Sequence, residues 1–236
     1  KLVFSTAMSS LRNSYNLSYT EPRLFDSEVL GGADIFRRQM NYFSFSSVTD
    51  GGGVRLGKNL GEYDWAGLNY RAENVTVSNV LEGTETPFLF NGTRHTSRVT
   101  PSYIHDTRDD FLNPTRGWRH VARFEIAGGV LGGLDFYRTG YEVTYYHPLV
   151  AKFVGAIHAE MNYAVGYGGT TLPIFERYFL GGPNSLRGYT IRNVGPKDSS
   201  GSPLGGTESI LLNVETQYPF TKSLRGFLFY DRGNAY

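Results

Sequence analysis

The sequence predicts an all-β fold, a transmembrane antiparallel β-barrel, and three observations lead to this class. Glycine supplies 29 of the 236 residues, tyrosine 17 and phenylalanine 16, a composition that disfavours helices and suits pleated surfaces. Polar and apolar residues alternate over long runs, as they do in strands with two different faces. Tyrosine and tryptophan gather near the ends of these runs, which is typical of the membrane interfaces of a barrel.

The alternation is clearest between Lys152 and Tyr167. One face carries Phe153, Gly155, Ile157, Ala159, Met161, Tyr163, Val165 and Tyr167, and the other face includes Lys152, His158, Glu160 and Asn162. This run exceeds the ~5–6 residues of a usual soluble strand and the ~9–11 residues that cross a bilayer at a tilt. We therefore expect a membrane-spanning strand, although a soluble β-sandwich would show a similar pattern.

The same period predicts eleven strands along the chain. They are expected at residues 1–11, 13–21, 28–40, 45–58, 62–79, 94–106, 117–129, 134–147, 151–167, 206–219 and 224–236. Compact or proline-bearing connections fall on one side, at 22–27, 59–62, 107–116, 148–151 and 219–223, and the other side carries the longer segments 80–93 and 168–205. Short turns opposite long loops are typical of outer-membrane barrels. An odd strand count and an end in mid-strand at Tyr236 predict a single partial barrel domain over residues 1–236.

Composition and charge exclude several functional classes. The absence of cysteine rules out a disulfide scaffold, a cysteine-ligated metal site and a cysteine nucleophile. With 23 basic and 22 acidic residues, the chain has no positive excess that would indicate nucleic-acid binding. The five histidines have no ligand spacing, so neither a metal nor another cofactor is expected. Asp106, Asp109 and Asp110 fit a charged turn, held by side-chain to backbone hydrogen bonds, better than a catalytic pair or a calcium site.

The segment 168–205 is longer than the ~12–15 residues of a passive connection, so we expect it to have a function. It contains the tetrad Leu186-Arg187-Gly188-Tyr189 within the run RYFLGGPNSLRGY. Other motifs lie in order along the chain: TEPRLF at 20–25, DTRD and PTRG between 106 and 117, and FYDRGN at 229–234. From about residue 13 to the C-terminus, this order of motifs resembles the BamA-like superfamily of outer-membrane insertases.

In that family the loop folds back into the barrel, and the arginine of the tetrad meets acidic groups on the inner wall. Carried over to this sequence, the resemblance implies that Arg187 pairs with Glu215 and Asp231. The alternation places Glu215 on a polar face, which supports this pairing, whereas Asp231 shares its face with aromatic residues. Gly188 is expected to permit a tight turn against the wall, and Tyr189 to add rigid contact area.

The resemblance also implies an architecture and a function. The barrel of the family has sixteen strands, so the chain would run from near the third strand to near the thirteenth, without the terminal strands and the N-terminal periplasmic repeats. The implied function is that of a non-enzymatic assembly factor, which inserts and folds β-barrel proteins into the bacterial outer membrane. Its implied partners are unfolded outer-membrane β-barrel clients, accessory lipoproteins and the lipid bilayer. A two-partner-type secretion translocator is the main alternative, followed by a passive porin and a soluble β-sandwich binding module.

Overall fold

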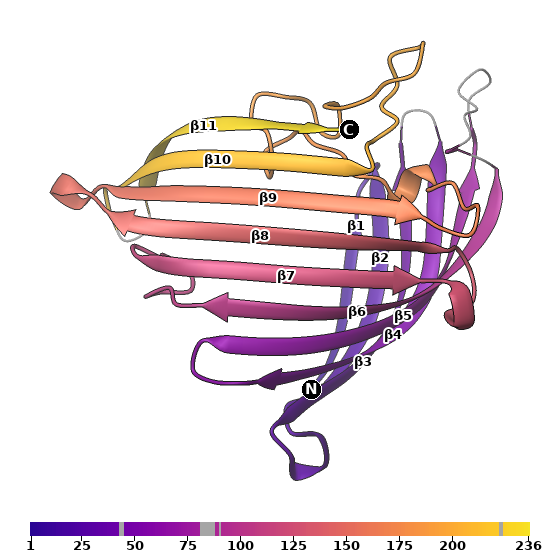
Figure 1. Ribbon diagram of the computed structural model, residues 1–236, viewed down its shortest axis with the longest axis horizontal. Helices are drawn as coiled ribbons and strands as arrows, with labels where there is room; N and C mark the ends of the chain where they lie inside the picture. Colours follow the sequence, from indigo (N-terminus) through magenta and orange to yellow (C-terminus); the bar gives the residue numbers. More distant parts are fainter. Residues whose placement is uncertain (43–44, 81–87, 90, 222–223) are drawn as a thin grey trace.

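The computed structural model describes residues 1–42, 45–80, 88–89, 91–221 and 224–236. Within them, eleven strands form one antiparallel sheet whose spatial order follows the chain (Figure 1). The strands are β1 (Leu2–Met8), β2 (Arg12–Glu21), β3 (Val29–Asn41), β4 (Ser46–Asn59), β5 (Asp64–Ser78), β6 (Gly92–Asp106), β7 (Gly117–Ala127), β8 (Phe136–Pro148), β9 (Val154–Gly166), β10 (Glu208–Pro219) and β11 (Arg225–Ala235). The predicted eleven antiparallel strands are thus confirmed, whereas most of the predicted loop 80–93 lies outside the described residues.

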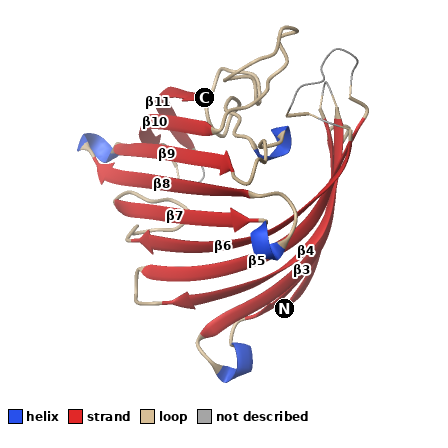
Figure 2. Cartoon of the chain, turned by 45° about the vertical axis from the view of Figure 1, so that its right-hand side comes forward, coloured by secondary structure: helices blue, strands red, loops and turns tan. Residues whose placement is uncertain are grey.

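Each strand pairs with the next strand along the chain, so β1 and β11 are the two edges of the sheet. The sheet curls into an open half-barrel with a concave and a convex face, in which β3 and β4 form one flank and β8 to β11 the other (Figure 2). The segment 168–205 connects β9 to β10 at the end of the sheet opposite the short turn between β8 and β9.

Alternation along the strands gives the two faces different chemistry. Large apolar side chains are exposed on the convex face, among them Ile35, Val54, Ile157, Met161, Ile210 and Leu228. A soluble protein rarely leaves so extended an apolar surface uncovered, whereas the wall of a membrane barrel turns such a surface to the lipid. The concave face carries the charged side chains that form the site described below.

The buried core lies between the concave face and the segment 168–205. Each of the three buried apolar clusters includes a side chain of this segment: Leu172 in one, Ile174 in another, and Leu180 with Leu186 in the third. Burial of such side chains is the main favourable contribution to folding. The segment therefore folds inward, and its contact with the wall takes the place of the sheet-on-sheet core of a β-sandwich.

Most strand ends differ from the sequence prediction by one to three residues, and at two of them the backbone conformation gives the reason. β9 begins at Val154 rather than at 151, because Ala151 (φ 53°) and Lys152 (φ 70°) have left-handed backbone in a 3-10 turn. β7 ends at Ala127 rather than at 129, because the two glycines that follow it also have positive φ. Left-handed residues lie far from the extended region that a strand requires. In the described part of the chain, no helix is long and apolar enough to cross a membrane.

Candidate functional site

The tetrad at 186–189 forms a turn on the concave side of the sheet. Leu186 is buried, and it packs against Leu180 of the same loop and Leu211 of β10. Gly188 has a φ of +86°, with no atom within 4 Å of the position where a Cβ would stand, so the left-handed backbone and not a close contact favours glycine here. Tyr189 is 61% exposed, so this side chain buries little of the contact area expected of it.

Arg187 extends from this turn to the inner wall of β10 and β11. Its Nε donates to Oδ2 of Asp231 at 2.8 Å, and its Nη2 donates to Oδ1 at 2.5 Å, which makes a two-pronged pair. Its backbone N–H donates to the same Oδ2 at 2.9 Å, and its Nη1 donates to Oε1 of Glu215. The planar guanidinium matches this geometry in a way that a lysine ammonium does not.

The wall around this pair is built by the register of the last two strands. Asn213 lies opposite Asp231, and Glu215 lies opposite Phe229, so all four side chains share the concave face. Asn213 donates to Asp231 at 2.7 Å and to the carbonyl of Ser185 at 2.8 Å. The ring of Phe229 lies 3.8 Å from Cζ of Arg187, which is the geometry of a cation–π contact. The aromatic neighbours of Asp231 are thus part of the arginine site.

Burial makes these interactions strong. The side chains of Arg187, Glu215 and Asp231 are 18%, 23% and 4% exposed. Hydrogen bonds to Asp231 outweigh the cost of desolvation and raise the pKa of Arg187 above its ordinary value. The guanidinium is therefore charged at every relevant pH. Breaking such a partly buried pair costs up to ~3–5 kcal/mol, because the other charge is left without a partner.

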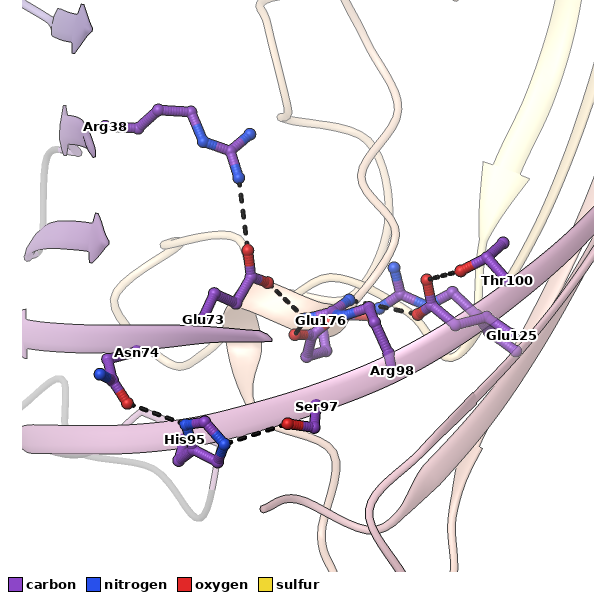
Figure 3. A network of polar contacts seen from close by, with 10 residues as sticks. Arg38, Glu73, Asn74, His95, Ser97, Arg98, Thr100, Glu125 and Glu176 are labelled. Carbon is purple, nitrogen blue, oxygen red and sulfur yellow. Dashed lines mark hydrogen bonds and ion pairs between the residues drawn. The ribbon is translucent and has the colours of Figure 1, made fainter. Parts of the chain in front are cut away.

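A second set of charges, which sequence reasoning missed, holds the start of the same loop (Figure 3). Glu176 is 4% exposed, and its Oε1 accepts a hydrogen bond from Nη2 of Arg98 at 2.7 Å. Its Oε2 accepts from Arg138, whose Nη2 also donates to the backbone carbonyl of Glu176 at 2.8 Å. The carboxylate of Glu176 in the loop thus forms hydrogen-bonded ion pairs with arginines of β6 and β8.

Further carboxylates of the wall complete this second set. Arg98 also donates to Glu73 of β5 at 2.5 Å and to Glu125 of β7 at 3.2 Å. We call Glu73, Arg98, Glu125, Arg138 and Glu176 the Glu176 cluster, and Arg187, Glu215 and Asp231 the Arg187 cluster. The signal in the sequence is the recurrence of charges on the polar faces of adjacent strands. Only the strand register and the path of the loop bring these charges together.

The two clusters hold different stretches of the loop against different strands. The Glu176 cluster joins the loop to β5, β6, β7 and β8, and the Arg187 cluster joins it to β10 and β11.

Comparison with known proteins identifies the family of the chain. The model of the Omp85 superfamily domain matches residues 1–236. The chain belongs to the Omp85 superfamily.

Curated relatives of this Omp85 chain are named as assembly proteins. The chain is 30% identical to the outer membrane protein assembly factor BamA of Nitratidesulfovibrio vulgaris, over 97% of the chain and 30% of that protein. It is 27% identical to BamA of Neisseria meningitidis serogroup B, over 94% of the chain and 31% of that protein. The chain thus spans about a third of the length of these bacterial relatives.

More distant similarity extends to a eukaryotic protein and to a solved structure. The sorting and assembly machinery component 50 homolog of Xenopus tropicalis is 25% identical over 96% of the chain and 49% of that protein. The crystal structure of BamA from Haemophilus ducreyi lacking POTRA domains 1–3 matches with a TM-score of 0.85 and 20% identity. The match covers 100% of this chain and 52% of that chain, and at this identity it supports the fold.

The other polar candidates of the sequence lie elsewhere in this Omp85 chain. Nδ1 of His105 of β6 donates to Oδ1 of Asp64 at 2.8 Å, and the ring of His105 lies 6.1 Å from that of His120. Among the described residues, no group of three or more histidine, aspartate or glutamate side chains could hold a metal ion. Asp109 and Asp110 accept backbone N–H groups within the turn between β6 and β7. These contacts match the interpretation as a charged turn.

Proposed function

We propose that the chain is part of the membrane domain of an assembly factor, which inserts and folds β-barrel proteins into the bacterial outer membrane. The observation that carries the proposal is the inward loop, whose Arg187 is held by two wall carboxylates. A passive pore needs only a constriction, and a constriction does not require a buried two-pronged ion pair. The names of the bacterial relatives support the same function.

The proposed work is physical and needs no covalent chemistry. A client strand that enters lipid must keep its backbone N–H and C=O groups paired, because nothing in the hydrocarbon can satisfy them. An open edge of the assembly factor can pair with that strand as a template. We place this edge at the seam of the complete barrel, outside the eleven strands described here. Unfolded outer-membrane β-barrel proteins are then the clients, and accessory lipoproteins are the proposed co-workers.

The part proposed for residues 168–205 is to keep the wall in one shape while the seam opens. The Glu176 cluster ties β5 to β8 to the loop, and the Arg187 cluster ties β10 and β11 to the same loop. Charged hydrogen bonds of fixed geometry resist bending better than apolar contacts, which can slide. Loss of one cluster would therefore loosen the wall without removing the template edge.

The test is a timed folding reaction in liposomes that contain the complete protein. An unfolded outer-membrane barrel protein is added, and its folding is followed with the wild type, with Arg187→Ala and with Lys197→Ala. Lys197 is an exposed cation of the same loop, so it is the matched control. We expect the wild type and Lys197→Ala to accelerate folding and Arg187→Ala to do so much less while its own barrel stays folded. A folded wild type that gives no acceleration, but steady solute flux, would favour a pore or a secretion translocator instead.

A further inference from the structure

A polar cavity on the concave face carries more positive charge than the neighbouring carboxylates balance. Its volume is ≈ 360 Å³, and it lies beside the Glu176 cluster. The charged residues in its lining are Arg12, Arg38, Arg71, Arg98, Arg138, Glu73 and Glu176. Glu125, which pairs with Arg98, adds a third carboxylate to these five guanidinium groups. The balance leaves a positive excess around a space that could hold a ligand.

Two of these arginines share one aromatic ring. Cζ of Arg38 lies 4.7 Å, and Cζ of Arg71 lies 5.1 Å, from the centre of the Phe36 ring. Phe36 lies over Gly51 of β4, where a Cβ would come within 2.9 Å of the ring. The glycine therefore makes room for the ring, and the ring brings two cations from β3 and β5 together. Like charges repel each other, and a bound anion offsets that repulsion.

The hydrogen-bond donors of these arginines are not used up. In the part of the chain that the structure describes, Nε of Arg71 is buried without a hydrogen-bond partner. Arg38 reaches the buried carboxylate of Glu73 only at 3.6 Å, which is longer than a hydrogen bond, and 40% of its side chain is exposed. Arg12 is exposed at the rim of the cavity. Free guanidinium donors of this kind match the oxygens of a phosphate group.

We infer that this cavity binds a phosphate group, either free phosphate or the phosphate monoester of a headgroup. Arg71 and Arg38 donate to its oxygens, and Arg12 adds charge at the rim. A phosphate monoester carries close to two negative charges near neutral pH, which balances the excess. This inference does not depend on the proposed assembly function.

The experiment is a calorimetric titration of the purified complete protein, in a detergent without phosphate groups. Inorganic phosphate is the first probe and glycerol 3-phosphate is the second. The variants are Arg71→Gln and the matched control Arg123→Gln, since Arg123 is a concave-face arginine that is 51% exposed and does not line the cavity. We expect saturable binding of phosphate to the wild type. Arg71→Gln should weaken the binding about tenfold, which is the effect of losing one charged hydrogen bond. Arg123→Gln should leave the binding unchanged.

Binding of both probes would identify a site open to monoester headgroups, and binding of inorganic phosphate alone would identify a site for the free anion. The absence of saturable binding of either probe to the folded wild type would overturn the inference. Equal weakening by Arg71→Gln and Arg123→Gln would overturn it too, because it would reduce the effect to general charge. Circular dichroism shows whether each variant keeps its strands. A further variant, Phe36→Leu, removes the shared ring without changing the charge, and it should also weaken phosphate binding.

Discussion

At the scale of single residues, the two carboxylates that hold Arg187 are not equivalent. Asp231 is 4% exposed and accepts from the backbone N–H, Nε and Nη2 of Arg187 and from Asn213. Glu215 is 23% exposed and accepts from Nη1 of Arg187 and from Gln217. The difference in burial and in the number of donors gives a rank order that can be measured.

We expect Asp231→Asn to lower the free energy of unfolding by ~3 kcal/mol, because a buried cation loses its two-pronged partner. Glu215→Gln should cost ~1 kcal/mol, since its site is more open to solvent. The measurement is the urea midpoint in detergent micelles, with Glu208→Gln, an exposed position on β10, as the control. Equal losses for the two variants would contradict the ranking.

The turn between β6 and β7 provides a prediction about pH. Burial alone would raise the pKa of Asp109, but hydrogen bonds from Thr115 and Arg116 lower it to about 2. A carboxyl whose pKa is lower in the folded state stabilises the fold above its unfolded pKa of about 4. This stabilisation is lost as the pH falls toward 2. Urea stability of the wild type should thus fall more steeply between pH 4 and pH 2 than that of Asp109→Asn, and parallel profiles would refute the assignment.

At the scale of elements, the loop 168–205 is held at two places that share no residue. Arg187→Ala should expose the stretch around 183–192 to protease, while the stretch around 172–178 stays protected by the Glu176 cluster. Glu176→Gln should give the reverse pattern. Limited proteolysis with mass spectrometry of the fragments shows which stretch each variant exposes. If the two clusters act independently, each variant should expose only its own stretch. Simultaneous exposure of both stretches by either single variant would show that the loop detaches as one unit.

The same loop shows what a sequence can and cannot predict. Alternation located all eleven strands, since each strand carries its own period of two. It did not locate the starts and ends that depend on backbone conformation, as at Ala151 and Gly128. The motif at 186–189 singles out Arg187, but no motif marks Glu176, because its partners come from strands far away in the chain. Likewise, the ring of Phe229 could be assigned to the arginine site only once the register of β10 and β11 was known.

At the scale of the whole molecule, the chemistry of the two faces decides which side meets lipid. Met161 and His158 lie on the same strand, β9, but on opposite faces. Met161 is 58% exposed among the apolar side chains of the convex face, whereas His158 lines a polar cavity beside Arg187. Charged substitutions at these two positions, three residues apart, therefore place a charge in lipid in one case and in a polar interior in the other.

We expect Met161→Arg to lower stability in lipid bilayers by ~2–4 kcal/mol, the cost of a cation on the lipid face near the bilayer midplane. His158→Arg should cost much less, because the concave face is polar and already holds charged groups. Met161→Gln controls for the loss of the apolar side chain without adding charge. The measurement is the free energy of folding of each variant, first into bilayers of defined thickness and then in detergent. The difference in lost stability between Met161→Arg and His158→Arg should be smaller in detergent. If arginine were tolerated equally well at both positions in bilayers, the convex face would not be the lipid-facing wall, and a covering by protein would have to be sought instead.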